Sequence, residues 1–289
     1  MVSSATEPHS AEGFATNGDV RIHYRVRGSG PAMLFLHGFP DTAETFSAQV
    51  EEFARDHMVI TPTLRGYPPS SVPPAVEDYA FPLLVEDVAA VLDELGVEQV
   101  TLLGHDWGGG VLQVFAAYFP ERVKGLAILN SPIVQRFDGL IRSDPEQQRR
   151  CEYMLPYLDY HEGDEKNIAH ITRTIRDADW RRHVADYLNR SPMEGMLNYY
   201  KAGGYPTPPY DLAQALVIPP QKAPVLVVWG LEDEYFGLEV LDAPWDAFED
   251  GYRMVGVRNA GHWVFRDQPD VVNAEIRSWL GTVLGESAA

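Results

Sequence analysis

The chain has 289 residues, 45% of them hydrophobic, and its 23 basic and 42 acidic side chains give a formal net charge of −19. This length and apolar content predict one core domain with room for an insertion, and the acidic charge argues against nucleic acid and anionic membrane surfaces as partners. The one cysteine, Cys151, allows no disulfide within the chain, which fits the reducing cytoplasm where we expect the protein to act.

The N-terminal part of the chain predicts a β-hairpin. Residues 1–12 are polar, so we expect a frayed tail and no secretory signal there. The Asn-Gly pair at 17–18 is a strong hairpin turn signal. After it, apolar and polar residues alternate over 20–25, which is the periodicity of a strand. The chain is therefore expected to open with two antiparallel strands.

Short apolar runs then predict strands that are buried on both faces, as in a parallel sheet. They span residues 32–36, 58–61, 100–103, 126–129 and 225–229. Helical periodicity lies between them at Leu83–Leu95 and Gly110–Phe119, and another helix is predicted to open at Pro269. No apolar run approaches the roughly 18 residues of a membrane span. The alternation of strands and helices predicts a doubly wound, mostly parallel α/β sheet.

Residues 133–215 interrupt this alternation. Helical signals dominate there, and Ser191-Pro192-Met193-Glu194 has the form of a capping box with proline at the first helical position. We interpret the segment as a helical cap inserted into the core. The expected organisation is a first core part at 1–132, the cap at 133–215 and a second core part at 216–289.

The strand at 100–103 runs into Gly104-His105-Asp106-Trp107-Gly108-Gly109 and then into a predicted helix. A strand, a tight turn and a helix form a nucleophile elbow, in which the residues two positions before and after the nucleophile must be small. Gly104 and Gly108 meet that requirement around Asp106. An aspartate with an ordinary pKa of about 3.9 is ionised near neutral pH and can attack a saturated carbon to form an alkyl ester. This chemistry favours an epoxide or a halide over a peptide or an ordinary ester as substrate.

Several short motifs occur in an order and spacing that are specific when taken together. They are His37-Gly38-Phe39-Pro40, Leu64-Arg65-Gly66-Tyr67, Gly104 to Gly109, Asn130-Ser131-Pro132, Tyr199-Tyr200-Lys201 and Gly261-His262. With them the chain resembles the epoxide hydrolase branch of the α/β-hydrolase superfamily over nearly its full length. The resemblance implies the α/β-hydrolase fold and the conversion of an epoxide to a vicinal diol through an ester on Asp106. It implies no cofactor and no metal, a small-molecule epoxide and water as partners, and a monomer or homodimer.

The resemblance also implies how the ester would be hydrolysed. A last core strand is predicted at 252–257, and His262 follows it, where the family has its general base, so it is expected to activate the attacking water. The backbone N–H groups of Phe39 and Trp107 are expected to form the oxyanion hole. His37 and His105 are expected to be structural residues.

The general base needs an orienting acid, which in this superfamily follows one of two strands. The strand that ends at Asn130 is followed by no carboxylate, so the acid is expected after the strand at 225–229. The family pattern favours Asp233 there, with Glu232 and Glu234 as alternatives. The triad would then run nucleophile, acid, base along the chain.

Two tyrosines of the cap are expected to donate protons to the epoxide oxygen. The family that the chain resembles uses two cap tyrosines in this role. Tyr200 matches one of them, and Tyr153 is expected to be the other, with Tyr157 and Tyr160 as alternatives. The side chains expected to contact the substrate are Trp107, Phe39, Trp180 and Tyr157. The aromatic residues of the cap suggest an apolar or aromatic epoxide.

Three other functions fit parts of the same sequence. A haloalkane dehalogenase could use the same triad and hold the halide through the indole N–H groups of Trp107 and Trp180, although those enzymes usually have Asn or Glu where Phe39 stands. A fluoroacetate dehalogenase fits less well, because that family has arginine in place of Trp107. A non-catalytic binding protein of the same fold is disfavoured, since all three triad positions are filled.

Overall fold

The computed structural model describes residues 10–203, 216–242, 247–249, 251–283 and 285. Its centre is an eight-stranded sheet with the strand order β1-β2-β4-β3-β5-β6-β7-β8. The strands are β1 (Ser10–Asn17), β2 (Val20–Arg27), β3 (Ala32–Leu36), β4 (Met58–Pro62), β5 (Val100–His105), β6 (Val123–Leu129), β7 (Val225–Gly230) and β8 (Tyr252–Val257). Each apolar run that predicts a strand lies within one of these strands.

The sheet is mostly parallel, as predicted. Strands β3 to β8 run parallel to one another, whereas β1 and β2 form an antiparallel hairpin that joins the sheet through an antiparallel pairing of β2 with β4. The hairpin closes at the pair Asn17 and Val20. The expected tail was too long, because β1 starts at Ser10 and residues 10–12 pair with 25–27. Backbone pairing at an exposed edge needs no apolar side chains, so polarity alone did not reveal this strand.

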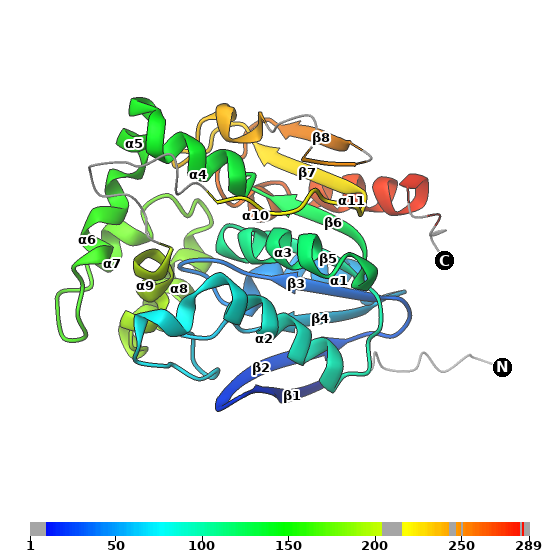
Figure 1. Ribbon diagram of the computed structural model, residues 1–289, viewed down its shortest axis with the longest axis horizontal. Coiled ribbons are helices and arrows are strands. Elements are labelled where there is room, and N and C mark those ends of the chain that lie inside the picture. Colours follow the sequence, from blue (N-terminus) through cyan, green and yellow to red (C-terminus); the bar gives the residue numbers. More distant parts are fainter. Residues whose placement is uncertain (1–9, 204–215, 243–246, 250, 284, 286–289) are drawn as a thin grey trace.

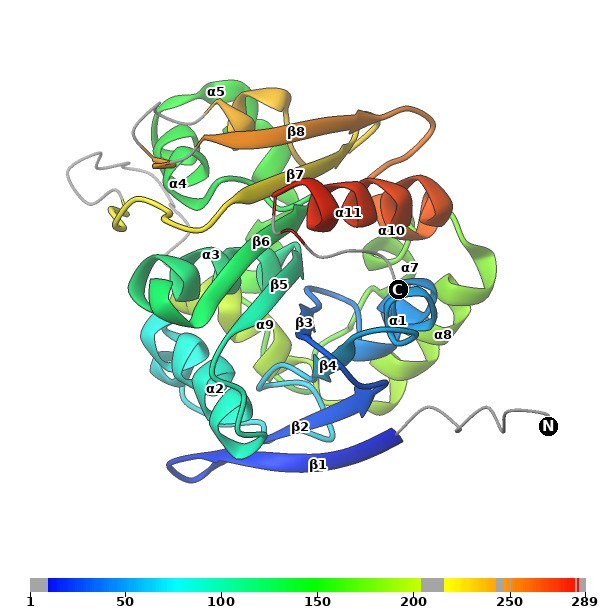
Figure 2. The same cartoon turned by 90° about the vertical axis from the view of Figure 1, so that its right-hand side faces the viewer.

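Helices cover both faces of the sheet. The α-helices of the described residues are α1 (Ser47–Phe53), α2 (Phe81–Glu94), α3 (Trp107–Tyr118), α4 (Val134–Ser143), α5 (Pro145–Arg150), α6 (Leu155–Leu158), α7 (Ile168–Ile171), α8 (Ala178–Arg190), α9 (Glu194–Ala202), α10 (Val264–Asp267) and α11 (Pro269–Val283). Figure 2 shows α2 and α3 on one face of the twisted sheet and α1 and α11 on the other. The α/β-hydrolase fold expected from the sequence is therefore present.

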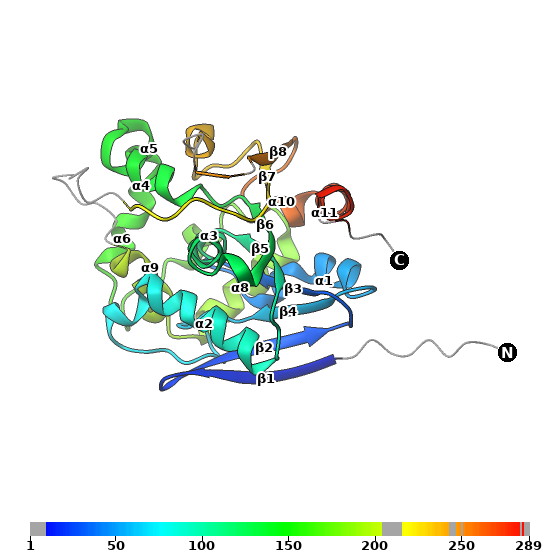
Figure 3. The ribbon, with the colours of Figure 1, turned by 45° about the vertical axis from the view of Figure 1, so that its right-hand side comes forward.

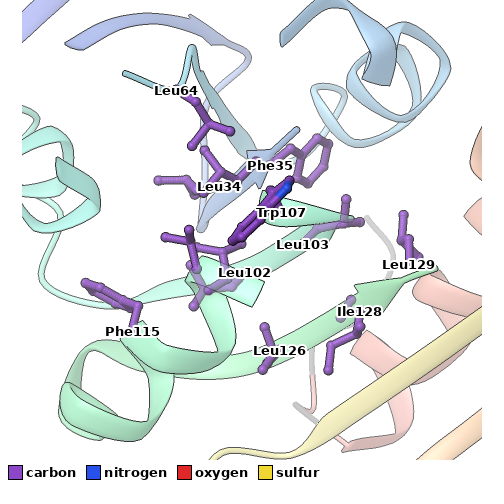
Figure 4. Packing of buried hydrophobic residues seen from close by; sticks show 14 of the residues in the cluster. Leu34, Phe35, Leu64, Leu102, Leu103, Trp107, Phe115, Leu126, Ile128 and Leu129 are labelled. Atoms are coloured by element: carbon purple, nitrogen blue, oxygen red, sulfur yellow. The ribbon is translucent and has the colours of Figure 1, made fainter. Parts of the chain in front are cut away.

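The hydrophobic core lies between the sheet and these helices. Strand β5 is buried at every residue, and α3 is buried from Trp107 to Ala117, because the helix crosses the middle of the sheet. Figure 4 shows leucine and isoleucine side chains of β3, β5 and β6 packed together, with Trp107 among them. Burial on all sides explains why the α3 sequence is almost uniformly apolar rather than striped. The rigid core fixes the position of the turn between β5 and α3.

The segment between β6 and β7 contains α4 to α9, and its described residues, 130–203 and 216–224, contain no strand beyond an isolated bridge at Gln221. These helices gather at one end of the sheet, away from the chain ends (Figures 1 and 3). Residues 204–215, the rest of the expected cap, lie outside the described residues. No helix in the described part of the chain has the length and apolarity needed to cross a membrane.

The expected capping box before α9 is wrong. Ser191 instead ends α8, where its backbone N–H donates to the carbonyl of Tyr187, and α9 begins at Glu194 without a side-chain cap of its own. The carboxylate of Glu162 accepts hydrogen bonds from the backbone N–H groups of Met193 and Glu194. A residue distant in sequence therefore supplies the N-terminal acceptor that the local pattern predicted for Ser191.

Candidate active site

The turn between β5 and α3 places Asp106 in a strained backbone conformation, with φ 52° and ψ −125°. Such a conformation costs a non-glycine residue about 1–3 kcal/mol and is typical of functional sites. A Cβ atom on Gly104 would come within 2.6 Å of the Cα of Gly109, and one on Gly108 within 2.2 Å of the Leu36 carbonyl oxygen. Glycine is therefore required on both sides of Asp106, as the elbow pattern predicts.

The carboxylate of Asp106 is held by backbone donors and faces an imidazole. Its Oδ1 accepts a hydrogen bond of 2.8 Å from the backbone N–H of Phe39, and its Oδ2 lies 3.7 Å from Nε2 of His262. Burial alone would raise the pKa of Asp106, but the interaction with His262 and the backbone N–H of Trp107 outweigh burial and lower it. The side chain is therefore a carboxylate at neutral pH, with one oxygen in contact with the expected oxyanion-hole residues.

Asp233 is the carboxylate that lies beside His262. Its Oδ2 lies 2.9 Å from Nδ1 of His262, and its Oδ1 accepts hydrogen bonds from the backbone N–H groups of Tyr235 and Phe236. Glu232 and Glu234 are exposed, and Glu232 forms a salt bridge with Arg176. These contacts follow from the turn after β7, which aims one of the three neighbouring carboxylates inward.

Two carboxylates control the charge of His262. Burial disfavours its charged form, but Asp233 and then Asp106 outweigh burial and raise the pKa of His262 to about 10. The imidazole is therefore protonated at neutral pH, beside the ionised carboxylate of Asp106. Removing the charge of either carboxylate would lower this pKa.

Two cavities meet at Asp106. The larger has a volume of about 200 Å³ and is lined mainly by apolar side chains of the core and of α4, among them Phe81, Trp107, Val134, Phe137, Leu216 and Phe236. The smaller, of about 10 Å³, is lined by Phe39, Pro40, Tyr157, Ile171, Tyr235, His262 and Trp263. Asp106, Tyr153 and Tyr200 line both cavities.

The two expected proton donors therefore lie where the cavities join. The ring of Tyr200 makes edge contacts with Phe39 and Trp107 and a tilted contact with Tyr157. Burial raises the pKa of Tyr200 well above its ordinary value. Burial likewise raises the pKa of Tyr153. Both phenols thus keep their protons at neutral pH. Of the alternatives, Tyr157 lines only the smaller cavity, and Tyr160 lines neither of the two.

The expectation that Trp180 contacts the substrate is corrected by the structure. Its indole N–H donates a hydrogen bond of 2.8 Å to the buried carboxylate of Asp41, and its ring stacks on His183. It is not among the lining residues of the two cavities. The sequence could not reveal this partner, because Asp41 lies 139 positions away along the chain.

Asn130 carries no charge, so the sequence does not place it among the candidate acids of the site. Its side-chain amide donates a hydrogen bond of 2.7 Å to Oδ2 of Asp233 and accepts one from the backbone N–H of Gly230. Asn130 also has a positive φ of 38°, which asparagine tolerates better than most residues. An asparagine directly after a buried strand was the available signal, and its role is to fix Asp233.

His37 and His105 contact backbone atoms around the site. Nε2 of His37 accepts a hydrogen bond from the backbone N–H of Leu64, and Nε2 of His105 lies 3.0 Å from the carbonyl oxygen of His262. Burial lowers the pKa of His37 to about 4 and that of His105 to about 3, so both are neutral. They hold the loops that carry the reactive side chains.

Comparisons with known proteins agree with this geometry. The family model of the alpha/beta hydrolase fold matches residues 31–269. Epoxide hydrolase 3 of Xenopus tropicalis is 29% identical over 293 residues, which cover 97% of this chain and 80% of that protein. The structure of a Bacillus megaterium epoxide hydrolase with an inhibitor matches with a TM-score of 0.83 at 29% identity, covering 93% of this chain and 100% of that one.

A point mutant of the Bacillus megaterium enzyme, complexed with its product (R)-3-[1]naphthyloxy-propane-1,2-diol, matches with a TM-score of 0.81 at 29% identity over 93% of this chain and 100% of that one. The chain therefore belongs to the alpha/beta hydrolase fold family, and these relatives, which match it over most of its length, are named epoxide hydrolases.

Proposed function

We propose that this protein is an epoxide hydrolase that converts an epoxide to a vicinal diol in two steps, through an ester on Asp106. The observation that carries the proposal is the meeting of Asp106 with two neutral tyrosines, Tyr153 and Tyr200, at the junction of the two cavities. A carboxylate nucleophile and two O–H donors are the groups that opening an epoxide ring requires. The names of the relatives point to the same reaction.

In the first step, the Asp106 carboxylate attacks a ring carbon and the carbon–oxygen bond of the epoxide breaks. The oxygen leaves as an alkoxide and takes a proton from Tyr153 or Tyr200. Once Asp106 is esterified its charge is lost, so the pKa of His262 falls from its value of about 10. The proton that His262 gives up restores the phenol through solvent, and the step ends with a neutral imidazole.

In the second step, neutral His262 takes a proton from water while the water oxygen attacks the ester carbonyl of Asp106. Asp233 holds the resulting imidazolium, and the N–H groups of Phe39 and Trp107 stabilise the tetrahedral oxyanion. The intermediate collapses, the leaving alkoxide takes the remaining proton of the attacking water, the diol leaves, and Asp106 returns as a carboxylate beside a protonated His262. The two steps together consume one epoxide and one water.

The contacts of Trp107 and Trp180 weigh against a haloalkane dehalogenase. That function needs indole N–H groups that face the leaving halide. The indole of Trp180 donates to Asp41, and the side chain of Trp107 is hydrogen-bonded with Tyr200. A halide in the site would have to displace both partners, whereas an epoxide oxygen would meet two phenols.

The cavities support an epoxide with one bulky apolar substituent. The larger cavity has the volume and the apolar walls to hold an aryl group, and the smaller leaves room for little more than water beside His262. The naphthyloxy diol bound by the Bacillus megaterium relative has this form. We therefore propose aryl-substituted terminal epoxides as the substrate class.

The test is a parallel assay of styrene oxide and a short bromoalkane, in which diol and released bromide are measured. We expect diol from styrene oxide and no bromide. Bromide without diol would move Trp107 to a halide-binding role and reject the epoxide hydrolase. A second comparison tests the substrate class. A bulky aryl glycidyl ether is expected to be hydrolysed faster than an epoxide with bulky groups on both carbons.

Substituting Tyr200 by phenylalanine is expected to slow opening of the epoxide by roughly 10- to 100-fold, because one of the two proton donors is lost. Tyr153→Phe should act in the same direction, and the double variant should lose more than either. Single-turnover measurement of ester formation separates this step from hydrolysis. Tyr160→Phe is the matched control and should leave the rate of ester formation unchanged. If this variant forms the ester slowly, Tyr160 rather than Tyr153 is the second donor.

The two steps should respond differently to pH. Asp106 has a lowered pKa, so it stays ionised and opens the epoxide at mildly acidic pH. His262 must be neutral for the second step, and in the esterified enzyme it gains a proton as the pH falls. We therefore expect the esterified fraction of the enzyme to rise as the pH is lowered from about 8 to about 5. Intact mass spectrometry of samples quenched during turnover measures it, and a constant fraction would contradict the role of His262.

A further inference from the structure

Asp41 carries a carboxylate that is fully buried and that the two-step reaction does not use. Oδ1 accepts a hydrogen bond of 2.8 Å from the indole of Trp180, and Oδ2 accepts one of 2.8 Å from the indole of Trp263. The hydroxyl of Thr45 donates a third, of 2.9 Å, to Oδ2. Burying a carboxylate against neutral donors alone is costly, so an apolar residue would be the simpler choice for a position that only packs.

Asp41 and its two indole donors come from parts of the chain that meet at the active site. Trp180 lies in α8, Trp263 directly follows His262, and Asp41 itself ends the loop in which Phe39 donates to Asp106. Asp41 is therefore a junction between the loop of the oxyanion hole, the loop of the general base and a helix of the cap.

Two routes connect Asp41 to His262. The first route runs along the chain, because Trp263 is the residue after His262. Asp41 holds the indole of Trp263, whose ring lies 5.0 Å from the ring of His262 and nearly perpendicular to it. The second passes through His105, whose Nδ1 lies 3.8 Å from Oδ2 of Asp41 and whose Nε2 lies 3.0 Å from the carbonyl oxygen of His262. The hydrogen bond to Trp263 restrains the backbone and the ring of the base, whereas the 3.8 Å separation between Asp41 and His105 is too long for a hydrogen bond.

A separate contact joins α10, the helix that follows His262 and Trp263, to the cap without involving Asp41. Arg266, three residues beyond Trp263, forms a salt bridge of 2.7 Å with Asp177, the N-cap residue of α8, and its guanidinium lies over the ring of Trp180. This contact offers a control, since it can be weakened while the hydrogen bonds to Asp41 stay intact.

We propose that Asp41 is a positioning residue for the second step: through Trp263 it holds His262 in line with the ester carbonyl, and through Trp180 it ties that alignment to the cap. The inference rests on the proposed two-step function. Opening of the epoxide depends on Asp106 and the two tyrosines, whereas hydrolysis of the ester depends on the angle of His262 and on the Phe39 N–H. Loss of Asp41 should therefore slow hydrolysis far more than ester formation.

The test uses Asp41→Asn in the full chain. The amide keeps the shape but offers one acceptor oxygen instead of two, and its NH₂ group faces a donor. We expect ester hydrolysis to slow by roughly 10- to 100-fold, because small misplacements of a catalytic group have effects of that size. Ester formation in a single turnover should change by less than about twofold, so the ester should accumulate and appear by intact mass.

Trp263→Phe provides a second variant that removes the N–H donor and keeps an aromatic ring at the position. It should reproduce the defect, and the double variant should be no worse than Asp41→Asn, since both remove the same contact. Asp177→Asn, which keeps the N-cap acceptor of α8 but removes its charge toward Arg266, should hydrolyse the ester at the normal rate.

The possible outcomes distinguish a failure of the role proposed for Asp41 from a failure of the two-step function. If both Asp41→Asn and Trp263→Phe slow the two steps equally, or slow neither, while His262→Gln accumulates ester, Asp41 has no positioning role and the proposed function stands. If no variant, His262→Gln included, ever carries an ester, the proposed two-step function itself is wrong.

Discussion

Asp106→Ala is expected to lower turnover of an epoxide by a factor on the order of 10⁴ or more, because it removes the nucleophile on which the ester forms. No other described carboxylate can replace it, since Asp106 is the one that faces His262 from the elbow and accepts from the Phe39 N–H. The measurement is diol formation from styrene oxide at substrate saturation.

Asp138→Asn is a matched control for this prediction. Asp138 is also a carboxylate in the wall of the larger cavity, where it is paired with Arg142. It should retain most of the activity, which shows that the loss in Asp106→Ala comes from the nucleophile and not from charge in the cavity. Substantial turnover by Asp106→Ala would mean that water attacks the epoxide directly, without an ester.

His262→Gln is expected to stop the reaction after its first step. Ester formation should continue, because the carboxylate of Asp106 and the two tyrosines remain, while hydrolysis should slow by about 10²–10⁴-fold without the general base. The enzyme should then gain a mass equal to that of the whole epoxide, since ring opening releases no leaving group. With a bromoalkane, a dehalogenase would instead gain the alkyl group without the bromine.

The double variant Asp106→Ala/His262→Gln controls for labelling at other residues and should gain no mass. An adduct that persists in it would place the covalent bond elsewhere on the chain. Rapid multiple turnover by His262→Gln with no adduct would remove the two-step mechanism, because the base would then be dispensable.

Local patterns in the sequence were sufficient for the sheet and the elbow. The strands at 100–105 and 225–230 are buried on both faces, so their composition alone identified them. The elbow was equally readable, because the requirement for glycine at 104 and 108 comes from atoms within the turn and the strand next to it. Family resemblance then added the expected partners of Asp106.

The cap was less predictable, since its contacts come from residues far apart in the chain. The capping box at Ser191 was wrong because Glu162 supplies the acceptors for α9. The role expected for Trp180 was wrong because Asp41 takes its N–H. A propensity or a motif describes what a segment can do alone, and tertiary partners decide which of its groups remain available.

The sequence by itself determined the fold class and the positions of the proposed nucleophile and base, because each depends on a short segment whose geometry is fixed locally. Only the tertiary structure decided that Asp233 rather than its neighbours faces His262, that Asn130 holds it there, and that Tyr153 joins Tyr200 beside the nucleophile. The reason is physical: a hydrogen bond or a shared cavity depends on distances of a few ångströms between segments separated by about 30 to 100 positions, and these distances are set by packing of the whole chain.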